Sequence, residues 1–281
     1  MKPIKIIADS MSDIPIELQK EYGITVLPLT IRFGEEEYKD GVDLKAEAFF
    51  GKLKAAPKLP TTSQVPPMKF QSEIQRYADL GYDVLVINGS SGVSGTHQSA
   101  VMAKTQLDIP GVEVFDTLAL SYGCGMMVVE AGKMAKQGYS KDEILTRLQD
   151  MKERTDHIFS VDTLEFLQKG GRLSASKAMM GTILNVKPIL TIVEGKVDSL
   201  DKVRGSRKVI PRMIELAKER GMKKGCERVG IAHGANIEGL EKLKEEIIRE
   251  FEPVDLVMSE IGGTIGTYTG PGLLALFYLK G

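Results

Sequence analysis

Small hydroxyl side chains are concentrated in three short segments of the first hundred residues, at positions 9–10, 61–64 and 89–96. Each segment follows a predicted strand or precedes a predicted helix. In open α/β sheets, ligands bind beyond the carboxyl ends of the strands, where helix N-termini offer unpaired backbone N–H groups to an anion. The three segments could therefore converge on one anionic group. Serine, threonine and glycine are also the usual residues of turns and helix caps, so no single segment establishes a site.

The residues missing from these segments restrict the ligand. None of the three contains lysine or arginine, and the sequence has neither a GxxxxGK[ST] loop nor a GxGxxG motif. A nucleotide polyphosphate is therefore a poor candidate. A single carboxylate, held by neutral hydroxyls and backbone amides, agrees better with the available charge.

Catalysis by one of the many serines is the main competing use. The nucleophile motif GxSxG is not matched, because residues 92–96 place the second glycine one position too early, at Gly95. The three histidines, His97, His157 and His233, are each better explained as helix-surface or loop residues than as a catalytic base. No histidine pair has metal-ligand spacing, and Cys124 and Cys226 lie in no CxxC motif. We therefore expect no catalytic residue, metal, cofactor or disulfide.

Two glycine-containing motifs stand out in the second half of the chain. In the first, Gly170 and Gly171 are expected to end a helix directly before Arg172. The second, residues 261–272, combines glycines with hydroxyl side chains and predicts a flexible segment or a tight turn close to another part of the backbone.

Taken in order, these motifs resemble those of the DegV family over nearly the whole chain. The matching segments are residues 7–13, 62–64, 90–96, 115–117, 170–174, 202–205 and 269–272. Members of that family are bacterial FakB-type fatty-acid-binding proteins, which present a bound fatty acid to an ATP-dependent fatty acid kinase for conversion to acyl phosphate. The resemblance thus implies a lipid carrier in phospholipid metabolism, without catalytic activity of its own.

The resemblance also implies where the ligand binds. The carboxylate would be held by Thr62 and Ser91, and the acyl chain would run between two domains. The family commonly has histidine where this chain has Tyr268, whose phenol donates a hydrogen bond of similar reach but carries no positive charge near pH 7. The complete prediction is a set of ligand contacts at Thr62, Ser63, Ser91, Ser94 and Tyr268, head-group neighbours at Ser10, Thr96 and Thr269, and partner contacts at Arg172 and Arg204.

The elements that must position these residues indicate an α/β fold. Ile- and Val-rich runs at 4–8, 25–33, 84–88 and 112–116 alternate with helical patterns, which is typical of a mostly parallel sheet with flanking helices. Ser140 and Glu143 form a capping box that begins a helix over 140–154. We expect an N-terminal α/β domain over residues 1–156 that carries the carboxylate-binding loops.

From residue 157 onward the pattern predicts a second α/β domain, over 157–281, with a mixed or antiparallel sheet that covers the acyl chain. A hairpin is expected from strands at 186–193 and 197–203 around the turn at 194–196. The further predicted elements are strands at 228–232, 254–261 and 273–279 and helices at 206–220 and 236–251.

Composition excludes several other classes of protein. The 281 residues are 42% hydrophobic and 27% charged, with a formal net charge of −1, as in an ordinary globular protein. This balance argues against nucleic-acid binding, which needs an excess of lysine and arginine. The first apolar run stops at Asp9, too early for a signal peptide, and the run at 273–279 is too short to span a membrane. We expect a cytoplasmic protein that is not stably inserted in a membrane.

The main alternative is an enzyme of related α/β architecture. A dihydroxyacetone-kinase-like substrate domain or a serine-dependent acyl hydrolase would use similar hydroxyl-rich loops. The absence of GxSxG, of a phosphate-binding loop and of a convincing base favours the carrier.

Overall fold

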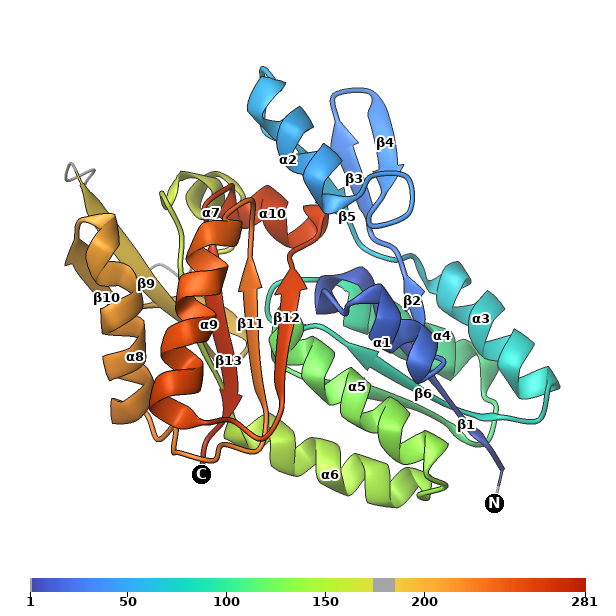
Figure 1. Ribbon diagram of the computed structural model, residues 1–281. Helices are drawn as coiled ribbons and strands as arrows, with labels where there is room; N and C mark the ends of the chain where they lie inside the picture. The colour runs from blue at the N-terminus through green and yellow to red at the C-terminus, as the bar shows by residue number, and fades with distance from the viewer. Residues whose placement is uncertain (1, 174–184) are drawn as a thin grey trace.

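The computed structural model describes residues 2–173 and 185–281, and its first sheet is parallel throughout (Figure 1). Its strands, in spatial order, are β2 (Thr25–Leu27), β1 (Ile4–Asp9), β6 (Asp83–Asn88) and β7 (Val112–Asp116). Alternate residues face opposite ways: Ile7 and Val86 pack towards α3 (Pro67–Asp79) and α4 (Thr96–Leu107). The other face is covered by α5 (Tyr122–Lys136).

The second sheet is mixed and has six strands. In spatial order they are β10 (Lys196–Arg204), β9 (Val186–Val193), β8 (Thr155–Ser160), β13 (Leu274–Leu279), β11 (Val229–His233) and β12 (Leu256–Glu260). Only the β11–β12 pair is parallel. Its outer face is covered by α8 (Val209–Glu219) and α9 (Ile237–Phe251), whereas α5 contacts its inner face. The predicted combination of a parallel and a mixed sheet with flanking helices is confirmed.

One predicted strand is divided between two sheets. Residues 25–33 form β2 and a separate strand, β3 (Thr30–Phe33), because Pro28 between them has no N–H to donate to a ladder. β3 is the central strand of a small antiparallel sheet with β4 (Glu36–Lys39) and β5 (Thr61–Ser63). The segment 61–64, expected to be a loop, is therefore mostly a strand.

The segment 261–272 is also different from its prediction. It contains a buried helix, α10 (Gly263–Thr269), that packs against α2 (Ala46–Ala55) and the small sheet. The Asp40 carboxylate accepts hydrogen bonds from the N–H groups of Gly263 (2.9 Å) and Thr264 (3.2 Å), which satisfies the start of this helix. The sequence predicts a flexible segment or a tight turn here because the capping carboxylate lies more than 200 residues away.

The other helices follow the local signals closely. α6 (Lys141–Arg154) begins with the predicted capping box, in which Ser140 and Glu143 bond to each other's backbone N–H. α7 (Glu165–Lys169) ends at the predicted Gly170-Gly171 pair, and Gly171 has a φ of 69°. The other helices among the described residues are α1 (Ile16–Glu21) and the 3₁₀ turns η1 (Ser10–Ser12) and η3 (Ser206–Lys208). Ser174, the last residue of the 170–174 motif, lies outside the described residues.

β8 begins at Thr155, so the second sheet starts slightly before the predicted domain boundary at 156/157. Within the described parts of the chain, no helix combines the length and the apolarity needed to cross a membrane.

Candidate functional site

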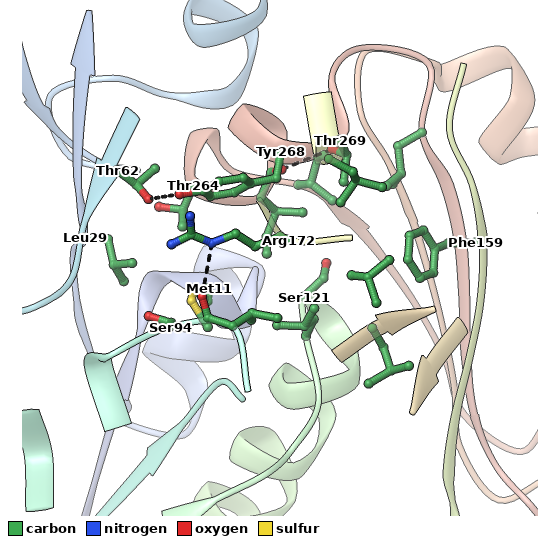
Figure 2. Close-up of a pocket in the computed structure, with 18 of the residues that line it drawn as sticks. Met11, Leu29, Thr62, Ser94, Ser121, Phe159, Arg172, Thr264, Tyr268 and Thr269 are labelled. Carbon is green, nitrogen blue, oxygen red and sulfur yellow. Dashed lines mark hydrogen bonds between the residues drawn. The ribbon is translucent and has the colours of Figure 1, made fainter. Parts of the chain in front are cut away.

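A cavity of about 330 Å³ lies between the inner face of the six-stranded sheet and the loops around the parallel sheet. Figure 2 shows its two ends: Thr62, Arg172 and Tyr268 gather on one side of the view, and Phe159 lies on the other. We call these the polar end and the apolar end.

The polar end joins residues that are far apart in the sequence. Thr62, on β5, and Tyr268, on α10, approach to 2.7 Å between their hydroxyl oxygens, although 206 residues separate them. The Arg172 guanidinium lies over the Tyr268 ring, 4.6 Å from its centroid. Gly170 leaves room for this ring, because a Cβ there would lie 2.4 Å from it.

Arg172 is the cation of this site. Its Nε donates to the Val93 carbonyl (3.3 Å) and its Nη1 to the Gly170 carbonyl (2.7 Å), which fixes the guanidinium at the cavity wall. Among the described residues it pairs with no carboxylate, and Nη2 makes no hydrogen bond. The hydroxyl segments themselves lack a cation, but Arg172 lies in the cavity wall beside them, so the polar end of the cavity is not purely neutral.

The serine loop at 90–95 presents one of its predicted hydroxyls to the cavity. Ser94 lines the polar end, where its Oγ accepts from the Thr96 N–H (3.2 Å) and lies 3.0 Å from Thr96 Oγ1. Ser91 is exposed and outside the cavity, because its N–H is drawn to the Asp116 carboxylate at the end of β7 (3.2 Å). Of the two predicted serines of this loop, Ser94 lines the cavity and Ser91 does not.

The other predicted residues are divided between the cavity and its surroundings. Ser63 and Thr269 line the cavity. Thr96 is buried beside Ser94, and the Ser10 hydroxyl accepts from the Leu29 N–H (3.1 Å), so both support the wall rather than form it. Arg204 is exposed at the end of β10, away from the residues that line the cavity.

The apolar end is built on the inner face of the six-stranded sheet. Because side chains alternate along a strand, one set of positions on β8 and β13 faces the cavity and the other faces α8 and α9. The apolar side chains that line this end are Leu120, Phe159, Ile192, Val197, Leu273, Ala275 and Phe277.

Two buried carboxylates hold the walls of the cavity together. Asp13 accepts from the Gly262 N–H (2.8 Å) with one oxygen and from the Ser121 hydroxyl (2.6 Å) with the other, and Ser121 lines the cavity. Asp40 caps α10, which carries Tyr268. Burial raises the pKa of both carboxyls above the ordinary value. Sequence reasoning missed both residues, since nothing local to them indicates a partner at 262–264.

Two of the three histidines accept hydrogen bonds from backbone N–H groups. The Leu120 N–H donates to His157 Nε2 (3.4 Å), and the Asn236 N–H donates to His233 Nδ1 (3.1 Å). His157 lies on β8 and is buried in the cavity wall, which corrects its expected place in a loop or on a helix surface. In residues 2–173 and 185–281, no serine hydroxyl is hydrogen-bonded to a histidine, and no cluster of histidine, cysteine and acidic residues could hold a metal ion.

Comparison with known proteins relates the chain to one family. Residues 3–281 match the family model described as "Uncharacterised protein, DegV family". A DegV domain-containing protein of Caldanaerobacter subterraneus subsp. tengcongensis is 40% identical over 278 residues, which cover 99% of each chain. Protein DegV of Bacillus subtilis is 34% identical, with 97% of this chain and 98% of that protein covered.

Two solved structures have closely similar folds. A DegV-family protein of Thermus thermophilus, described for its fatty acid binding, superposes with a TM-score of 0.93 at 31% identity. DegV of Bacillus subtilis, described as a fatty acid binding protein, superposes with a TM-score of 0.89 at 32% identity. Both comparisons cover 100% of both chains.

Proposed function

This chain belongs to the DegV family, and from that premise we propose that it binds one long-chain fatty acid. The carboxylate would lie at the polar end of the cavity and the acyl chain would extend to the apolar end. The similar proteins of known structure that are described as fatty-acid-binding support this proposal.

The observation that carries the proposal is the Arg172 guanidinium, which has no carboxylate partner in residues 2–173 and 185–281. A partly buried cation without a carboxylate partner is unfavourable unless an anion completes the site. Thr62, Ser94 and Tyr268 add hydroxyl groups around the same space, and all three line the cavity with Arg172. One carboxylate, with two acceptor oxygens, matches this set of donors.

The apolar end agrees with a hydrocarbon tail. Its wall is made of aliphatic and aromatic side chains, and the cavity volume of about 330 Å³ is in the lower part of the range for small-molecule sites, about 300–1000 Å³. In this proposal the N-terminal domain, ending before β8, supplies Thr62 and Ser94. The C-terminal domain supplies Arg172 and Tyr268 and covers the acyl chain.

We further propose that a separate ATP-dependent fatty acid kinase acts on the bound acid, as the resemblance to FakB-type proteins implies. Ser63 and Gln64, at the polar end, are exposed, so the head group would lie near the surface. A carboxylate oxygen would bond to the γ-phosphorus of ATP while the bond from that phosphorus to the bridging oxygen breaks and ADP leaves. Arg204, outside the cavity, is a candidate for contact with the kinase. The proposed setting is the bacterial cytoplasm, with a role in phospholipid metabolism.

An enzyme of related architecture is the less favoured candidate. Hydrolysis by serine needs a base within hydrogen-bonding distance of the hydroxyl, whereas His157 and His233 are bound to backbone N–H groups. A carrier needs no such base.

Denaturing extraction of the purified protein followed by mass spectrometry tests the proposal. We expect about one fatty acid per chain. The kinase step is tested by trapping acyl phosphate with hydroxylamine, which should succeed only when kinase and ATP are both added. A protein that retains no fatty acid, or that forms acyl phosphate from ATP alone, would favour the enzyme.

A further inference from the structure

His157 is a polar side chain in the apolar part of the cavity wall. It is 4% exposed, and its ring packs edge to face on Phe277 with 5.5 Å between centroids. Helix α5 lies directly against its Nε2 edge, since a Cβ at Gly123 would be 2.3 Å from Nε2. Binding of a simple carboxylic acid, as proposed above, assigns no role to this imidazole.

The hydrogen bond at Nε2 fixes the position of the ring proton. The Leu120 N–H donates to Nε2, so this nitrogen is the acceptor. Burial lowers the pKa of His157 to about 4, and the ring is therefore neutral at pH 7. A neutral imidazole that accepts at Nε2 carries its hydrogen on Nδ1.

The Nδ1–H group is a donor without a protein acceptor. Within the described residues, Nδ1 makes no hydrogen bond, and it is not among the buried atoms that are both unpaired and sealed from solvent. His157 lines the cavity, and its Nδ1 keeps some accessible surface. A donor in such a place needs an oxygen from a ligand or from water.

We propose that His157 Nδ1–H donates a hydrogen bond to an oxygen on the acyl chain itself, so that the cavity takes oxo fatty acids, with a ketone at one position along the chain. This inference rests on the proposed fatty acid binding. A ketone fits better than a hydroxyl group, because His157 offers a donor and has no free acceptor for a hydroxyl proton. Leu120 and Phe277, which contact the ring, have apolar side chains and provide no competing donor.

Calorimetric titration of delipidated protein with stearic acid and with a positional series of oxostearic acids tests this subsite. At most positions a buried ketone without a donor should weaken binding roughly 5- to 150-fold relative to stearate. With the ketone at one chain position, or at two adjacent ones, the loss should be nearly absent. The hydroxystearic acid with its hydroxyl group at that same carbon should bind more weakly than the oxostearic acid. His157→Phe, which keeps an aromatic ring, should abolish this exception, whereas Ile192→Val, a change in the same wall, should keep it.

The outcomes separate the two proposals. Stearate that does not bind would contradict the proposed function itself. Stearate that binds while every oxo position loses affinity equally would contradict only the His157 subsite, as would an exception that survives in His157→Phe. The position series on the unmodified protein decides the question even where the variant does not fold.

Discussion

The two ends of the cavity are built in opposite ways. The polar end is assembled from short, irregular pieces: β5, the serine loop, the turn after α7, and α10. The apolar end is one face of a regular sheet, where alternation along β8 and β13 places the lining side chains. Positioning of the head group thus depends on a few long-range hydrogen bonds, whereas the tail wall depends on the packing of a continuous core.

This difference predicts two kinds of failure. A defect at the polar end should weaken the binding of every acid by the same factor, whatever its chain length, because every acid has the same carboxylate. A defect at the apolar end should affect only acids long enough to reach it. Four substitutions test this contrast, from the largest expected effect to the smallest.

Arg172→Gln should have the largest effect. Hydrogen bonds to a charged group contribute about 1.5–3 kcal/mol, so affinity should fall roughly 10- to 150-fold. The factor should be the same for laurate and palmitate in calorimetric titration. Arg204→Gln, an arginine substitution outside the cavity, should leave fatty acid affinity unchanged. A loss confined to palmitate would contradict the separation of the two ends.

Thr62→Val removes one hydroxyl and keeps the shape of the side chain. We expect a loss of about 10-fold in affinity, again independent of chain length, with little change in thermal unfolding. Thr61→Val is the matched control, because Thr61 is the adjacent residue on β5 and is exposed. Equal affinities of the two variants would place the carboxylate elsewhere.

Ala275→Val should act only on the tail. The added methyl groups would displace about one methylene from the apolar end, which lowers the affinity of the longest acids about fourfold. Short acids serve as the internal control and should bind as they do to the unmodified protein. If short acids are weakened by the same factor, the substitution has disturbed the whole cavity and the contrast fails.

Asp13→Asn tests the support of the polar end through pH. Burial raises the pKa of Asp13, so its contribution to stability is complete below the ordinary aspartate pKa and is lost as pH rises through the raised value. In denaturant titrations, the free energy of unfolding of the unmodified protein should therefore rise relative to that of Asp13→Asn as pH is lowered from the raised pKa to the ordinary aspartate pKa.

Asp156 on β8 provides the opposite control. Burial opposes its ionisation, but hydrogen bonds from Arg220 outweigh burial and lower its pKa. Its contribution is present above the ordinary aspartate pKa and is lost as pH falls through the lowered value. Asp156→Asn should therefore show the reverse dependence. The same sign for both variants would contradict the contrast between the two carboxyls.

Local patterns in the sequence were sufficient for the regular parts of the fold. The strands at 84–88 and 112–116, the hairpin around 194–196 and the capping box at Ser140 are confirmed, because each depends on neighbouring residues. Helix α10 and the division of 25–33 were not predicted, since they depend on Asp40 and on Pro28 in a tertiary setting.

The site was predictable only in part for the same reason. The resemblance to the family and the hydroxyl segments identified Thr62, Ser94 and Tyr268, which the fold brings together at the polar end. Arg172 was expected at a partner interface, although it lies in the cavity wall. The glycine pair before Arg172 was the sequence feature that could have indicated its place in the cavity wall. Gly170 makes room for the Tyr268 ring, and the guanidinium lies on that ring.

The dependence of affinity on chain length tests the central claim most directly. Each methylene removed from water contributes about 0.8 kcal/mol, so titration of the delipidated protein with saturated acids should show affinity rising about fourfold per carbon until the cavity is full, and then levelling or falling. Equal affinity for acetate and palmitate would show that no acyl chain is buried, and the assignment of this chain as a fatty-acid carrier would have to be abandoned.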